Sequence, residues 1–363
     1  MESMVARNSD HGRVKYVFVC GLPRSGTSLL GRNIARLESC TGLRDTGVLE
    51  DEGVFLQTVY PTEDMHGGPG RFGFHPRAHL TETSALLTPD NVAKLRESWH
   101  PYWDNSKTIF VEKTPANLLM TRFLQAAFPN SYFVVIKRHP VAVGLAGQKW
   151  KVNVTSLYNM FEHWLYCHAL YEQDKEYLKH VYELKYEDYV ENPDKYHAEL
   201  AAFIGTWVPE PPRHDQSRIV LQSPEPRVVL VPERTMEETS AHYNKKYLDR
   251  WYRLLTNSPF KGYYWYIARK YEPKFDKYGY SLTEGFQLSE AALHRRGKLW
   301  DAIGAFYCHA ADACAFTRRL SARLPQQVRM SAKAVLPAVV VTKIRQAREK
   351  NEMSEARTQK PET

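Results

Sequence analysis

A strand, a glycine-framed loop and a helix follow one another near the amino end of the chain, and they constrain the fold more than any other feature. Residues 21–28 read Gly-Leu-Pro-Arg-Ser-Gly-Thr-Ser. A short apolar run over 14–20 precedes them, and an amphipathic segment over 29–37 follows. In that setting backbone N–H groups and a helix N-terminus cradle a phosphate. We therefore expect residues 21–28, the phosphate-binding loop, to bind a phosphate group.

The phosphate-binding loop departs from the pattern of P-loop ATPases and kinases at one position. Gly21, Gly26 and Ser28 keep the frame G-x-x-x-x-G-K-[ST], but Thr27 stands where those enzymes have lysine. That lysine reaches the β- and γ-phosphates of the nucleotide. The cation of this loop is Arg24 instead. The loop is therefore suited to a phosphate, but poorly suited to holding a γ-phosphate for transfer.

Apolar runs separated by helical patterns predict the fold class. Short runs rich in β-branched and aromatic residues indicate buried parallel strands at 14–20, 108–112, 131–137 and 181–186. Helical patterns lie between them at 117–128 and 157–178. This alternation predicts an α/β fold, a P-loop type parallel sheet flanked by helices. Ligands in such sheets bind beyond the carboxyl ends of the strands, which is where the phosphate-binding loop lies.

Charge and composition divide the chain into four expected parts. The net charge is +8, and from Thr283 onward 14 Lys and Arg stand against 8 Asp and Glu. The basic character is therefore a carboxyl-terminal property, which weakens a nucleic-acid interpretation. We expect a flexible N-terminus, a main α/β domain, a basic helical extension and a disordered tail, at 1–13, 14–282, 283–350 and 351–363.

Other segments bear on location and on the substrate pocket. No apolar run approaches the roughly 20 residues of a membrane span, and we find no signal peptide and no paired-cysteine pattern. We therefore expect a cytoplasmic protein. The Gly- and Pro-rich stretch 63–76 reads as a long surface loop. Aromatic residues are numerous enough to line a pocket, although they fit a core equally well: Tyr60, Phe72, Phe74, Trp99, Tyr102 and Trp103.

Three further signals follow the phosphate-binding loop in chain order. They are Glu-Lys-Thr-Pro at 112–115, Lys-Arg-His-Pro at 137–140, and Tyr-Glu-Asp at 186–188 followed by Asn-Pro. Together with Pro-Arg-Ser-Gly-Thr-Ser, the set resembles the sulfotransferases that use 3′-phosphoadenosine 5′-phosphosulfate (PAPS). The variety resembled is the bacterial sulfotransferase family 3 type, related to the tyrosylprotein sulfotransferases. The resemblance covers roughly residues 14–282 and leaves out the basic extension.

The resemblance implies roles for the phosphate-binding loop. Ser25, Gly26, Thr27 and Ser28 match the residues that hold the 5′-phosphate of the donor, and Arg24 matches the cation near its bridging oxygen. Sulfuryl transfer, like phosphoryl transfer, develops charge on equatorial oxygens and on a leaving phosphate. Cations and N–H donors placed where that charge develops lower the barrier.

The later motifs imply the rest of the donor site. Lys113 matches a lysine that reaches the transferring sulfuryl group, Arg138 the arginine that binds the 3′-phosphate, and Tyr186 a residue near adenine. An arginine fork suits phosphate geometry. The chain departs from the family at Ala146, where a serine usually shares the 3′-phosphate. Three residues could take over that contact: Gln148, Lys149 or Lys245. Trp164 belongs to the predicted helix that, in the family, lies near the nucleotide, although a tryptophan on an apolar helix face is more often a core residue.

The general base is expected among acidic residues after the phosphate-binding loop. In the cytosolic branch it is a histidine, but the corresponding position here is Pro115. In the tyrosylprotein branch it is a glutamate some 20–30 residues past the loop, and Glu50-Asp51-Glu52 falls in that window. A carboxylate can accept the proton of an acceptor hydroxyl. Glu52 is the first choice and Glu50 the second. Outside candidates are His66, His79 and Glu82.

The sequence therefore predicts a PAPS-dependent sulfotransferase. It would move a sulfuryl group to a hydroxyl or amine of a small-molecule or glycan acceptor and release adenosine 3′,5′-bisphosphate, with no metal. The alternatives are a P-loop kinase or other nucleotide phosphotransferase, and a non-catalytic module that binds nucleotide or an anionic membrane through its basic tail. The helices of the extension could form an oligomer contact. The acceptor itself is not identified by the sequence.

Overall fold

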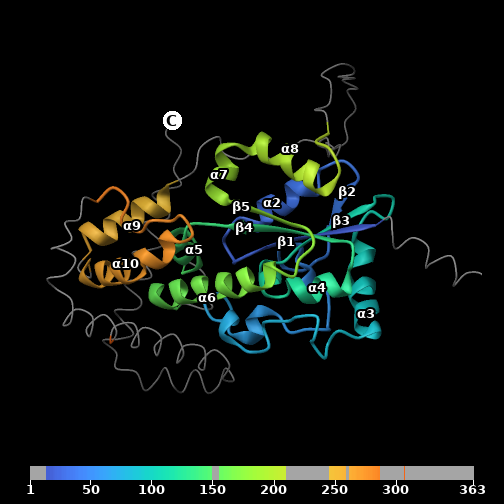
Figure 1. Cartoon of the computed structure of the whole chain (residues 1–363), viewed down its shortest axis with the longest axis horizontal. Helices are drawn as coiled ribbons and strands as arrows, with labels where there is room; N and C mark the ends of the chain where they lie inside the picture. The colour runs from blue at the N-terminus through green and yellow to red at the C-terminus, as the bar shows by residue number, and fades with distance from the viewer. Residues whose placement is uncertain (1–13, 149–154, 210–244, 259–260, 287–305, 307–363) are drawn as a thin grey trace, which may run out of the picture. The chain divides into compact units, whose positions relative to one another are not determined.

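Five parallel strands form one sheet in the order β2-β3-β1-β4-β5 (Figure 1). This is a computed structural model, and it describes residues 14–148, 155–209, 245–258, 261–286 and 306. The strands are β1 Lys15–Gly21, β2 Cys40–Gly42, β3 Ile109–Lys113, β4 Ser131–Lys137 and β5 Val181–Lys185. The predicted α/β class with a parallel sheet is confirmed, and so are the four predicted strands. Sequence inspection missed β2, because three residues give no periodic signal.

The sheet is buried on both faces, and alternate residues of β1 belong to different cores. Val17 and Val19 pack with helices on one face, whereas Phe18 and Cys20 pack with helices on the other. All four side chains are fully buried. A strand covered on both faces reads as a continuous apolar run rather than as an alternating one. That explains why the run Val-Phe-Val-Cys was recognisable in the sequence.

Helices form a layer on each face of the sheet (Figure 1). One layer consists of α2 Thr27–Ile34, α7 Tyr186–Glu191 and α8 Pro193–Ile204. The other face is covered by α3 Pro89–Trp99, α4 Thr121–Ala127, α5 Pro140–Gly147 and α6 Leu157–Lys175. Two later helices, α9 Lys246–Thr256 and α10 Lys261–Asp276, pack against α5 and α6. The predicted helix at 117–128 is in fact two pieces, η7 Pro115–Leu119 and α4, which are interrupted at Met120.

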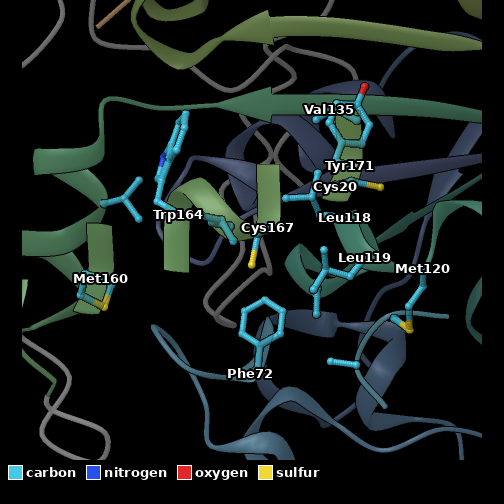
Figure 2. Close-up of a cluster of buried hydrophobic side chains, with 14 of the residues drawn as sticks. Cys20, Phe72, Leu118, Leu119, Met120, Val135, Met160, Trp164, Cys167 and Tyr171 are labelled. Atoms are coloured by element: carbon cyan, nitrogen blue, oxygen red, sulfur yellow. The ribbon is translucent and has the colours of Figure 1, made fainter. Parts of the chain in front are cut away.

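The segment between β2 and α3 is built from short 3₁₀ turns. They are η2 Leu49–Asp51, η3 Gly53–Phe55, η4 Glu63–His66 and η5 Phe72–Phe74, and a further turn, η6 His100–Tyr102, follows α3. The prediction of a surface loop over 63–76 is wrong for Phe72, which is fully buried. Figure 2 shows Phe72 pointing toward Cys167 of α6 and Leu119 of η7. Close packing on α6 therefore draws this segment onto the core.

The connections place a crevice at the carboxyl end of β1. The chain leaves β1 for α2 on one face, whereas it leaves β3 and β4 for helices on the other face. Ligand sites of open α/β sheets form where neighbouring connections diverge in this way. Of the other predicted parts, 1–13 and 351–363 lie outside the described residues, as does nearly all of the extension at 283–350.

Candidate active site

The phosphate-binding loop has the conformation of an anion cradle. Arg24 and Gly26 both have positive φ, 74° and 101°, and α2 begins at Thr27. Ser25 is fully buried, and its Oγ has no hydrogen-bond partner in the described part of the chain. A buried hydroxyl without a partner is rare enough in proteins to call for an explanation. The orphan hydroxyl and the N-terminus of α2 fit a bound phosphate.

Arg138 comes from the end of β4 and reaches the same loop. Its Nη1 donates a hydrogen bond to the carbonyl oxygen of Arg24 at 2.9 Å. Its guanidinium carbon lies 4.0 Å from the ring centroid of Tyr186 and 5.8 Å from that of Tyr247. Its Nε is buried and makes no hydrogen bond to any described residue. Trp164 of α6 donates to the carbonyl oxygen of Arg138 at 3.1 Å, so this core tryptophan holds the backbone of the arginine.

Tyr186 lies directly on Gly26. A Cβ atom added at Gly26 would approach Cδ2 of Tyr186 to 2.4 Å, which no real contact allows. Glycine is needed at this position for its positive φ and again for this close approach. The ring of Tyr186 therefore connects the phosphate-binding loop with Arg138.

Lys113 ends β3 and pairs with Glu52 beside the loop. Its Nζ donates to Oε1 of Glu52 at 2.8 Å and to the carbonyl oxygen of Glu50 at 3.1 Å. Both side chains of the pair are about nine-tenths buried. Gly31 of α2 permits the close approach of Lys113, since an added Cβ there would lie 3.0 Å from the lysine Cβ. Two candidates that are 61 positions apart in sequence thus meet at one edge of the sheet.

The backbone around Glu52 is strained and clamped. Glu50 and Asp51 have φ of 56° and 50°, and left-handed conformations of such residues cost of order 1–3 kcal/mol each. The next residue, Gly53, donates its N–H to Oε1 of Glu112 at 2.9 Å and accepts from Nε1 of Trp99 at 2.9 Å. Strain of this kind persists only where the surroundings over-determine it.

Glu112 supplies most of that clamp from inside the protein. It is almost completely buried, and its carboxylate also accepts hydrogen bonds from Oγ1 of Thr114 at 2.6 Å and from Nδ2 of Asn117. Burial raises its pKa, and these three hydrogen bonds oppose the rise. The hydroxyl of Thr114 in turn accepts from the backbone N–H of Val54 at 3.3 Å, so Glu112 holds the turn both directly and through Thr114. Glu112 is therefore a positioning residue, and the motif Glu-Lys-Thr-Pro gave it no such role.

Glu52 is poised to exchange a proton near neutral pH. Burial raises its pKa to about 7, although the charge and hydrogen bond of Lys113 act in the opposite direction. A general base works best when its pKa lies near the working pH. The electrostatics therefore favour Glu52 over an exposed carboxylate, and the side chain of Glu50 is exposed.

A cavity of about 300 Å³ opens beside this pair; we call it the Glu52 cavity. Its wall includes Arg24, Thr27 and Ser28 of the phosphate-binding loop. Its other lining residues are Pro23, Leu49, Glu50, Glu52, Phe55, Glu63, Asp64, Pro69, Pro115 and Gly147. The volume is at the lower end of the roughly 300–1,000 Å³ usual for small-molecule sites. The cavity therefore suits a small molecule that contacts both Glu52 and the loop.

Glu63 is a lining residue that sequence reasoning missed. Its Oε2 is buried without a hydrogen-bond partner among the residues that the structure describes. Burial raises its pKa to about 8, and the charge of Glu52 adds to the rise. In the sequence Glu63 sits in a polar Pro-Thr-Glu-Asp stretch, which reads as solvated surface. Only the packing of the 63–74 segment on the core brings it into the cavity.

Several predicted contributors lie elsewhere or are already engaged. His79 contacts Asp174 at 2.8 Å, Glu82 pairs with Arg122, and Gln148 donates to the carbonyl oxygen of Thr155. His66 stacks on His75 next to the Glu52 cavity and is not among its lining residues. For the suggested aromatic residues, the core alternative fits better than the lining of this cavity, whose aromatic lining residue is Phe55. None of the six suggested aromatics lines it, and four of them are buried in the core: Tyr60, Phe72, Trp99 and Trp103.

The structure describes Ala146, which replaces the family serine, and Lys245, which could take over its contact. Ala146 is buried in α5, and Lys149 lies outside the described residues. Lys245 is described and precedes α9, whose Tyr247 is near Arg138. Within the described residues, no group of three or more His, Cys, Asp or Glu side chains has the arrangement of a metal site. No helix among them has the length and apolarity to cross a membrane.

A sequence model of the sulfotransferase family matches residues 17–210, which is more than half of the chain. No curated protein sequence shows significant similarity to it.

Solved structures of sulfotransferases resemble the chain at low sequence identity. A sulfotransferase from Mycobacterium tuberculosis is 14% identical, with 58% of this chain and 73% of that one covered and a TM-score of 0.37. The sulfotransferase domain of the curacin biosynthetic pathway is 16% identical, with 74% and 98% covered and a TM-score of 0.40. A sulfotransferase from Alicyclobacillus acidocaldarius is 16% identical, with 52% and 80% covered and a TM-score of 0.34. On the strength of the sequence match over 17–210, the chain belongs to the sulfotransferase family and is an enzyme of that type.

Proposed function

We propose that the chain transfers a sulfuryl group from PAPS to a hydroxyl group of a small molecule bound in the Glu52 cavity. The observation that carries this proposal is the buried Lys113–Glu52 pair, at 2.8 Å, beside a cavity whose wall includes residues of the phosphate-binding loop. Glu52 as the base, Arg24 as a cation and the phosphate-binding loop border this cavity, and Lys113 pairs with Glu52. Sulfuryl transfer requires these three elements together.

The donor is held by two groups of residues in this proposal. Backbone N–H groups of the loop and the hydroxyls of Ser25, Thr27 and Ser28 bind its 5′-phosphate. The orphan Oγ of Ser25 supports that role, because a phosphate oxygen would satisfy it. Arg138 binds the 3′-phosphate through its guanidinium group, whose Nε donates no hydrogen bond to any described residue. The guanidinium group of Arg138 is held in place by a cation–π interaction with the ring face of Tyr186.

The acceptor side depends on Glu52 as the general base. The acceptor oxygen attacks sulfur, so a new S–O bond forms as the bond from sulfur to the bridging phosphate oxygen breaks. The electron pair of that bond leaves with the phosphate of adenosine 3′,5′-bisphosphate. The hydroxyl proton passes to the carboxylate of Glu52. Glu50 contributes its carbonyl oxygen, which holds Lys113, rather than its carboxylate.

Two cations meet the charge that develops in the transition state. Lys113 lies at the end of β3, and its ammonium group is held by Glu52 and by the carbonyl oxygen of Glu50. When the donor binds, its sulfuryl oxygens offer the ammonium a second partner, and Glu52 is then released to the acceptor. Arg24, which lines the Glu52 cavity from the loop, stabilises the bridging oxygen. Cations preorganised in this way need no reorganisation during the reaction.

Calorimetry tests the donor assignment. Adenosine 3′,5′-bisphosphate, adenosine 5′-monophosphate and ATP are titrated into the full chain, with and without magnesium. We expect the bisphosphate to bind most tightly and without need of magnesium, because Arg138 recognises the 3′-phosphate. Preference for ATP with magnesium, together with indifference to the 3′-phosphate, would overturn the proposal in favour of a nucleotide phosphotransferase.

A further inference from the structure

Glu63 is a carboxyl group that the proposed reaction does not use. It lies on η4 and lines the Glu52 cavity together with Glu52 itself. Its Oε2 is buried, and no described residue offers it a hydrogen bond. Native proteins pair the great majority of buried polar side-chain atoms. Glu63 also lines a second cavity of about 10 Å³, beside His66 and Phe72, which holds at most about one water molecule. Of these two cavities, only the Glu52 cavity has room for a ligand that would give Oε2 a partner.

The charges around the Glu52 cavity are strongly unbalanced. Four carboxyl groups belong to its described lining: Glu50, Glu52, Glu63 and Asp64. Arg24 is the one Lys or Arg in that lining, and it lies on the phosphate-binding loop, where the donor phosphates bind in the proposed reaction. The rest of the described lining is mainly apolar, with Leu49, Phe55 and three prolines. Because Glu52 is paired with Lys113, the excess of carboxyl groups in the lining lies mainly at Glu50 and Glu63, beside an apolar wall.

This imbalance acts on the base as well as on the acceptor. Burial and the neighbouring carboxylates already raise the pKa of Glu52 to about 7 and that of Glu63 to about 8. An acceptor that carries an anion would raise both further and keep Glu52 protonated, which would remove the base. An acceptor that carries an ammonium group would lower both pKa values and favour the ionised base.

We propose that the Glu52 cavity takes an acceptor with a hydroxyl group and a cationic amine, such as an amino alcohol or an aminoalkyl phenol. The hydroxyl meets Glu52, the amine donates a hydrogen bond to Oε2 of Glu63, and the apolar body lies on Leu49, Phe55 and the prolines. This inference rests on the proposed sulfuryl transfer, and it adds the substrate class and a residue that determines specificity.

The test uses three phenols of one skeleton that differ in charge: 4-(2-aminoethyl)phenol, 4-(2-hydroxyethyl)phenol and 4-hydroxyphenylacetate. Each is titrated, up to millimolar concentration, into the full chain saturated with adenosine 3′,5′-bisphosphate, and each is tried as an acceptor with PAPS. We expect the amine to bind and react best and the carboxylate worst. A charge-assisted hydrogen bond is worth roughly a 10- to 100-fold preference.

Variants assign that preference to Glu63. Glu63→Gln should reduce the ratio of amine to neutral phenol to near one, while leaving bisphosphate affinity unchanged. Glu63→Asp keeps the charge and should keep part of the ratio. Glu97→Gln changes an exposed residue of α3 that is not part of the lining of the cavity, so it removes the same charge and should leave the ratio intact.

The outcomes separate this inference from the proposed function. Bisphosphate binding with equal or tighter binding of the carboxylate phenol would overturn the inference alone. The same holds if none of the three phenols binds, or if Glu63→Gln leaves the ratio unchanged. A wild-type chain that does not bind the bisphosphate would overturn the proposed function, and the inference would fall with it.

Discussion

The two halves of the candidate site are built in different ways. We propose that one half binds the donor and the other the acceptor. The proposed donor half consists of residues that end regular strands or follow them directly: the phosphate-binding loop after β1, Arg138 after β4 and Tyr186 after β5. The acceptor half consists of 3₁₀ turns between β2 and α3, and it includes the strained residues Glu50 and Asp51. The first half takes its geometry from the sheet. The second takes its geometry from side chains such as Glu112 that hold it in place.

The difference has a functional consequence. Residues that directly follow paired parallel strands are anchored at one end by the hydrogen bonds of the sheet, so we expect the geometry of the donor half to change little when a ligand binds. The turns of the acceptor half have few ladder hydrogen bonds, and such regions open at lower free energy cost. Changes in one half should therefore leave the function of the other measurable, and this separation can be tested by mutation.

The largest effect is expected from Glu52→Gln. The variant keeps the shape of the side chain but cannot accept a proton, so kcat should fall by about 10²–10⁴, as for other general bases. Affinity for adenosine 3′,5′-bisphosphate should stay within a few-fold, because Glu52 belongs to the acceptor half. Steady-state transfer kinetics and calorimetry on the same sample measure both quantities. An active variant would show that the base is another group, with Glu63 the next candidate.

A smaller loss is expected from Arg138→Ala, and it should fall on the opposite half. Hydrogen bonds to a charged partner contribute about 1.5–3 kcal/mol, so bisphosphate affinity should drop by roughly 10- to 100-fold. Affinity for adenosine 5′-monophosphate, which lacks the 3′-phosphate, should change much less. Arg253→Ala, an exposed residue of α9, serves as the control. Equal losses for both nucleotides would mean that Arg138 supports the loop through the Arg24 carbonyl and does not recognise phosphate.

The pH dependence of the reaction should reflect the acceptor half alone. Glu52 must be ionised to accept a proton, and burial raises its pKa to about 7. The value of kcat/KM should therefore rise about tenfold per pH unit below 7 and level off above it. Bisphosphate binding should not follow the same curve. A profile that is flat from pH 5 to 8 would contradict the raised pKa of Glu52.

The same division explains what could be predicted from the sequence. Apolar runs are local signals, so four of the strands and the phosphate-binding loop after β1 could be predicted from them. Lys113, Arg138 and Tyr186 were assigned through the resemblance to a family, and all three end or follow strands whose carboxyl ends lie on one edge of the sheet. Glu52 was found through the resemblance to a family, not through any local pattern. Glu63 was missed because its burial depends on packing between 63–74 and α6. No hydrophobic pattern in this polar, glycine-rich stretch predicts that packing.

The last test concerns the residue that joins the halves. Glu112 belongs to β3, next to Lys113, but its hydrogen bonds to Gly53, Thr114 and Asn117 hold the acceptor turn. Glu112→Gln puts an NH₂ group where N–H and O–H donors converge. At least one donor then loses its partner, at about 1–3 kcal/mol of unfolding free energy.

Because Gly53 follows Glu52 directly, turnover should fall with the stability of the turn, by a few-fold to tenfold, while bisphosphate affinity is retained. Denaturant unfolding, calorimetry and transfer assays measure the three quantities. Glu183→Gln, a partly exposed glutamate of β5 that pairs with Lys137 and Lys175, removes a carboxylate from the same sheet and should cost less than about 1 kcal/mol. If Glu112→Gln weakened bisphosphate binding as much as turnover, the two halves would form one cooperative unit, and the contrast between them would be one of local geometry only.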